Sequence, residues 1–249
     1  MLSIAGVIGA GLFVGSGRAI AEAGPATILA YILAGGLVVL VMRMLAEMAV
    51  ASPDTGSFST YADLAIGKWA GYTIGWLYWW FWVILMAWEA YVAGKILHGW
   101  FPSISVNVFV LATTLLLITV NFFNVKHYGE FEFWFALIKI VAVVAMIATG
   151  IYLLSTTHNP TQTISNLWTQ GGFLPNGFKG LFMAFAFIMF AFGGVEMLGF
   201  AAAETEEPRK VIPKAINQLM VRVLLFYVGS MAVLLSLTPW TDLVAQLKA

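Results

Sequence analysis

Three ionisable side chains, Glu89, Lys139 and Glu196, lie inside long apolar stretches, where they could do chemistry. A charge at the centre of a membrane-spanning helix costs about 2.5 to 3.5 kcal/mol, so we expect each to be buried against protein or a cavity. Lys139 could take up and release a proton there, or it could be a fixed amine bonded to helix carbonyls. Glu89 could be a working acid or a paired carboxyl that fixes helix packing.

The first apolar stretch is unusually rich in glycine, with Gly6, Gly9, Gly11, Gly15 and Gly17 within twelve residues. Each glycine weakens a helix by roughly 1 kcal/mol relative to alanine. The glycines could serve close helix packing. Alternatively, the helix could be broken near residues 9–11, so that free N–H groups and a positive helix end bind a carboxylate at mid-membrane depth.

A second glycine interruption occurs at residues 190–196, where Gly193 and Gly194 precede Glu196 in an apolar segment. Interrupted segments at corresponding positions of two halves are typical of transporter binding sites. The first and sixth apolar segments correspond if five helices form one repeat. An odd number of spans would invert the second repeat in the membrane.

Seven apolar segments can position these residues. The 249 residues are 61% hydrophobic and only 10% charged, which is typical of a polytopic membrane protein. Spanning a bilayer as helix takes about 20 apolar residues. The predicted spans are roughly residues 1–20, 27–50, 72–98, 104–123, 131–154, 179–202 and 219–238. Gly24-Pro25 is a suitable entry to the second span.

Charge and composition exclude several function classes. Twelve basic and twelve acidic residues cancel, so nothing favours a nucleic-acid partner, and the absence of cysteine excludes disulfides and thiolate metal sites. Motifs for a nucleophile elbow, a P-loop or a zinc protease are missing, so we predict neither an enzyme nor a cofactor. Basic residues cluster after even-numbered spans, which places the amino terminus in the cytoplasm.

Several runs of the sequence resemble the amino acid-polyamine-organocation superfamily, and within it the bacterial amino acid transporter family. The resemblance extends through the whole chain and is most specific in residues 1–16, 21–26, 42–49 and 54–63. It implies an all-α integral membrane protein with a LeuT-like fold of two inverted five-helix repeats. Spans one and six would be discontinuous, and about seven of an expected twelve spans would be present.

The family resemblance also assigns roles to individual residues. It places the substrate carboxylate on the backbone amides of Gly9, Ala10 and Gly11, and the substrate amine on carbonyls near Phe190. It identifies Lys139 as the lysine that replaces a sodium ion, and Glu89 as a functional acid of span three. The predicted amine-binding segment consists of Phe190, which matches the gating aromatic of the family, and of Ala191, Phe192 and Gly193.

The function that this resemblance implies is proton-coupled uptake of 4-aminobutyrate or a related small amino acid across the bacterial inner membrane. Residues 1–156 would form the first repeat, 157–178 an external loop and 179–249 the start of the second. The implied partners are the amino acid, protons and the lipid bilayer, together with a second copy or missing carboxy-terminal spans. The alternative is a truncated, non-transporting membrane fragment or a regulatory subunit.

Overall fold

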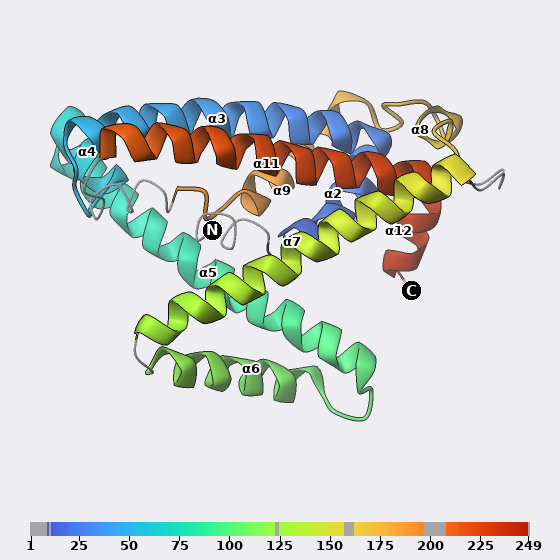
Figure 1. The fold of residues 1–249 in the computed structure, drawn as a ribbon, viewed down its shortest axis with the longest axis horizontal. Coiled ribbons are helices and arrows are strands. Elements are labelled where there is room, and N and C mark those ends of the chain that lie inside the picture. The colour runs from blue at the N-terminus through green and yellow to red at the C-terminus, as the bar shows by residue number, and fades with distance from the viewer. Residues whose placement is uncertain (1–8, 10, 123–124, 157–161, 197–207, 249) are drawn as a thin grey trace. The chain divides into compact units, whose positions relative to one another are not determined.

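The computed structural model describes residues 9, 11–122, 125–156, 162–196 and 208–248. Throughout these residues the chain forms helices and connecting turns, without a β-strand (Figure 1). The prediction of an all-α protein is therefore confirmed. The chain divides into two compact units, residues 1–51 with 133–249, and residues 52–132.

The first unit contains most of the helices, together with the part of α7 (Val125–Thr156) from residue 133 onward. Its amino-terminal segment begins with a π-helix and continues as α-helix. The described elements are η1 (Gly11–Gly15), α2 (Ser16–Ala23), η2 (Gly24–Ala26), α3 (Thr27–Ala51), α8 (Asn166–Thr169), α9 (Gly177–Ala191), α11 (Pro208–Leu237) and α12 (Trp240–Lys248).

The boundary between α2 and α3 follows from three residues, Gly24, Pro25 and Thr27. Gly24 adopts φ +58° and ψ −137°, a conformation that glycine reaches without steric cost. Pro25 then lies in the first turn of η2, where its missing N–H is not needed. The buried Thr27 hydroxyl donates to the Ala19 carbonyl at 3.0 Å and joins the two helices. The predicted helix entry at Gly24-Pro25 is confirmed.

The core of the first unit forms where α3 packs along α11 and α9. Ala30, Tyr31 and Ala34 of α3 are buried, and small residues on this face let the helix backbones approach closely. A Cβ on Gly35 would lie 2.5 Å from Leu224 Cδ2 of α11. The same face of α3 therefore packs directly against α11.

The second unit contains α4 (Phe58–Ala65), α5 (Lys68–Trp100) and α6 (Val106–Asn121). In the turn before α4, Asp54 Oδ1 accepts hydrogen bonds from Thr60 Oγ1 at 2.7 Å and from the Gly56 N–H at 2.6 Å. The hydrogen bond from Thr60, followed by that from Gly56, holds the pKa of Asp54 below its usual value. Because the folded pKa is lowered, this carboxylate supports the turn at neutral pH and loses that support in acid.

Many large apolar side chains of both units are exposed, including Trp69, Tyr72 and Trp76, which form a stripe along α5. Among the described residues, segments 11–51, 68–100 and 133–156 are long and apolar enough to cross a membrane. The helices of residues 224–237 and 240–247 are bent by 97° relative to each other and make a fourth candidate span if they are counted together. Helices α6 and α9 are apolar but shorter. Apart from a few end residues and the turn after α9, the predicted spans are helical wherever they are described.

The approach of α7 to α11 in the first unit can be tested by cross-linking in this cysteine-free chain. A Cβ on Gly150 would lie 3.6 Å from the Cβ of Val233, within the range that disulfides require. We expect the double variant Gly150→Cys/Val233→Cys to lose both free thiols on mild oxidation, as measured by alkylation and mass spectrometry.

The matched control pairs Val233→Cys with Gly36→Cys, because nothing lies within 4 Å of a Cβ at Gly36. This control should keep both thiols free. Retention of both thiols in the Gly150 variant as well would contradict the packing of α7 on α11.

Candidate functional site

The amino-terminal half of the predicted site has an irregular backbone. Gly9 and Gly11 are described, whereas Ala10 lies outside the described residues. The Leu12 N–H donates to the Gly9 carbonyl at 3.1 Å, and among the described residues of this segment regular α-helix begins at Ser16, after η1. Single π-helical turns are rare and occur frequently at functional sites. The glycine-rich segment is thus irregular where a break was predicted, and the part of span one before Gly9 stays a prediction.

The carboxy-terminal half of the site begins where α9 ends. The Phe192 N–H donates to the carbonyls of Ile188 at 3.1 Å and Met189 at 3.3 Å, and the Gly193 N–H donates to that of Phe190 at 3.1 Å. Gly194 then takes φ +100°, so the helix stops inside the predicted sixth span. Whether a second helical half follows stays a prediction, because residues 197–207 lie outside the described part.

The two halves meet at Gly11 and Ala191. A Cβ on Gly11 would lie 2.7 Å from both Cα and Cβ of Ala191, closer than real Cβ atoms come. Where α2 ends and α9 begins, Asn176 Nδ2 donates to the Glu22 carbonyl at 2.7 Å, and Gly180 faces that same carbonyl. The amino-terminal segment and α9 therefore run antiparallel, with the start of η1 beside the end of α9.

The turn after α9 rests on a buried aromatic cluster of Phe192, Tyr31 of α3 and Tyr227 of α11. The ring of Phe192 lies 6.1 Å from that of Tyr31 and 5.0 Å from that of Tyr227, and the two tyrosine rings are 5.4 Å apart. Both tyrosines are fully buried, and the Tyr227 hydroxyl donates to the Ala191 carbonyl at 3.4 Å. Sequence reasoning missed both tyrosines, although each is a polar aromatic inside an apolar span.

The remaining predicted residues of the first unit lie on α9, on α7 and in the turn after α9. Phe190 is half-buried in the last turn of α9, and Lys139 is half-buried in α7. Glu196 is half-buried and accepts a hydrogen bond from the Gly194 N–H at 2.9 Å, so its carboxylate closes the turn after α9. A group of three or more His, Asp or Glu residues able to hold a metal does not occur among the described residues.

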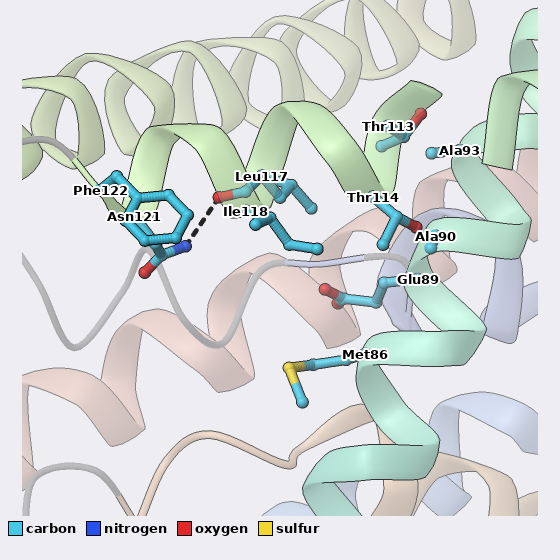
Figure 2. Close-up of a pocket in the computed structure, with 10 residues that line it drawn as sticks. All are labelled: Met86, Glu89, Ala90, Ala93, Thr113, Thr114, Leu117, Ile118, Asn121 and Phe122. Carbon is cyan, nitrogen blue, oxygen red and sulfur yellow. Dashed lines mark hydrogen bonds between the residues drawn. The ribbon is translucent and has the colours of Figure 1, made fainter. Parts of the chain in front are cut away.

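Glu89 belongs to the second unit, and its predicted burial is wrong. Its side chain is exposed and borders an open cavity of about 550 Å³ between α5 and α6 (Figure 2). Within this unit α5 packs chiefly against α4 and α6, so much of its circumference has no protein cover. Across the cavity, the hydroxyls of Thr113 and Thr114 donate to their own helix at 2.8 Å, which leaves oxygen lone pairs on that wall.

Comparison with known proteins identifies the family. The amino acid permease family matches residues 1–247, nearly the entire chain. The chain belongs to the amino acid permease family. It is 56% identical over 246 residues to a probable GABA permease of Pseudomonas aeruginosa, covering 97% of this chain and 52% of that protein.

Two further relatives are also named as transport proteins. The gamma-aminobutyric acid permease of Escherichia coli is 56% identical over 242 residues, with coverage of 96% of this chain and 52% of the relative. The aromatic amino acid transport protein AroP of Escherichia coli is 49% identical over 247 residues, with coverage of 99% and 54%. The chain spans about half the length of these relatives.

The contact between Gly11 and Ala191 predicts a strong effect of one methyl group. We expect Gly11→Ala to push the amino-terminal segment away from α9 and to lower the free energy of unfolding by about 1 to 3 kcal/mol, as overpacked contacts do. Fluorescence-detected size-exclusion after heating in detergent measures the change.

Gly17→Ala is the matched control, because a Cβ there would meet only the flexible end of Leu247, at 2.8 Å. We expect this variant to retain wild-type thermal stability. Equal stability of the two variants would contradict the close contact at Gly11.

Proposed function

We propose that this chain belongs to a secondary active transporter that takes up a small amino acid across the bacterial cytoplasmic membrane, driven by a proton gradient. The three relatives described above are transport proteins for amino acids by name. The long apolar helices with outward-facing apolar side chains support a multi-pass membrane protein. The distribution of Lys and Arg supports a cytoplasmic amino terminus.

The observation that carries this proposal is the contact of two opposite helix ends at Gly11 and Ala191. The amino-terminal end of a helix bears partial positive charge and the carboxy-terminal end partial negative charge. An amino acid at neutral pH carries a carboxylate and an ammonium group together. One helix end beside the other can hold both groups, with the carboxylate on the amides of Gly9, Ala10 and Gly11 and the ammonium on carbonyls from Phe190 to Gly193.

The substrate that we propose is 4-aminobutyrate or a related small amino acid. Two relatives at 56% identity are named for this substrate, whereas the aromatic amino acid transport protein is 49% identical. The contact itself is made by small residues, and the aromatic cluster lies behind the turn after α9.

For coupling, we propose that Lys139 takes up and releases the transported proton and that Glu89 assists it. Lys139 is half-buried in a long apolar helix, and its amine is a group that can carry a proton. The carboxylate of Glu89 borders an open cavity, which would be its route to protons. No cofactor takes part in this proposal.

The direct test is uptake of labelled amino acids, including 4-aminobutyrate, into proteoliposomes with and without an inward proton gradient. The chain is tested alone and as a hybrid in which it replaces the matching half of the Escherichia coli gamma-aminobutyric acid permease. We expect gradient-dependent uptake in the hybrid. Uptake by the chain alone would show that these residues suffice, and absence of uptake in both would overturn the proposed function.

The role of Lys139 predicts a separation of coupling from binding. We expect Lys139→Ala to abolish gradient-driven accumulation by the hybrid while substrate exchange across the membrane persists, because recognition uses backbone groups elsewhere. Uphill uptake and counterflow exchange are measured in parallel. Lys179→Ala, which removes an exposed lysine of α9, is the control and should retain both activities.

Equal loss of accumulation and exchange in Lys139→Ala would favour the structural alternative, in which the amine only holds helices together.

A further inference from the structure

The backbone carbonyls in the last turn of α9 differ in the hydrogen bonds that they accept. Those of Ile188, Met189 and Phe190 accept the N–H groups of Phe192 and Gly193. The carbonyl of Ala191 accepts none of the N–H groups described beyond the helix end, and its hydrogen bond comes instead from the Tyr227 hydroxyl. The side chain that bonds to this carbonyl thus belongs to another helix, α11.

The hydrogen bond from Tyr227 leaves the Ala191 carbonyl able to accept a further hydrogen bond. The oxygen–oxygen distance of 3.4 Å exceeds the roughly 2.7 to 2.8 Å of a strong O–H···O bond. A carbonyl oxygen also has two lone pairs, of which one hydroxyl uses one. The oxygen lies 3.3 Å from the position that a Cβ on Gly11 would occupy, so it is situated directly beside the start of η1.

The donor itself is held in place. Tyr227 is fully buried, and its ring packs against those of Phe192 and Tyr31 at centroid distances of 5.0 and 5.4 Å. The neighbouring Tyr31 is equally buried, yet its hydroxyl has no hydrogen-bond partner among the described residues. Of the two tyrosines, Tyr227 therefore has a hydroxyl bonded to the backbone at the end of α9, and Tyr31 does not.

We propose that Tyr227 is a positioning residue, which fixes the Ala191 carbonyl beside η1 so that this oxygen receives the ammonium group of the substrate. This inference rests on the proposed function, because it assigns the ammonium to one of the four carbonyls in the predicted segment. A fixed acceptor binds a cation better than a mobile one, since its orientation entropy is already lost before binding. Tyr227 itself does not touch the substrate.

The test compares Tyr227→Phe with Tyr31→Phe in the hybrid permease, using the amino acid of the uptake panel that wild type binds best. Each variant removes one buried hydroxyl and keeps the ring. We expect Tyr227→Phe to raise the Kd of that amino acid about five- to tenfold, the effect of one hydrogen bond, and Tyr31→Phe to leave it unchanged. Thermal stability in detergent is recorded for both.

A second readout separates positioning from general damage. The carboxylic acid that lacks the amino group, such as butyrate for 4-aminobutyrate, competes through its carboxylate alone. We expect its inhibition constant to be the same in wild type and Tyr227→Phe. Equal weakening of both ligands, or an unchanged Kd in Tyr227→Phe, would overturn the positioning role. Absence of amino acid binding by the wild-type hybrid would overturn the proposed function instead, and this inference with it.

Discussion

The contact of Gly11 with Ala191 is the constraint on which the rest of the first unit depends. Because neither residue places a bulky side chain in the interface, η1 and α9 approach at backbone distance. That approach brings the amino end of one helical segment beside the carboxy end of another, so opposite partial charges lie next to each other. The long helices α3 and α11 then cover the turn after α9 through the cluster of Tyr31, Phe192 and Tyr227.

Much of this arrangement could be predicted from the sequence, because membrane helices follow simple rules of length and polarity. Runs of about 20 apolar residues predicted the helices, and Gly24-Pro25 predicted the boundary between α2 and α3. The glycines near positions 9–11 and 193–194 predicted irregular backbone, since their cost in a regular helix needs a compensating reason. Their matching positions in two repeats pointed to a binding site, and the family resemblance placed one substrate group on each segment.

Other features depend on tertiary contacts that no local pattern encodes. A tyrosine in an apolar span is usually a core residue, so nothing in the sequence distinguished Tyr227, which bonds to the backbone, from Tyr31, which does not. The burial expected of Glu89 was wrong, because position within a span does not determine which face of a helix is covered. Glu89 and Lys139 also lie in different compact units, so their joint role in coupling stays a prediction.

The antiparallel pair of the amino-terminal segment and α9 has a mechanical consequence. Contact at Gly11 restrains one end, and contact at Glu22 with Asn176 and Gly180 restrains the other. If one segment slid along the other by one residue, side chains would replace the glycines at the two close contacts. If the segments pivoted about one contact, the other contact would open. The two contacts therefore fix the segments to each other at both ends, and the pair is restrained to move as one body.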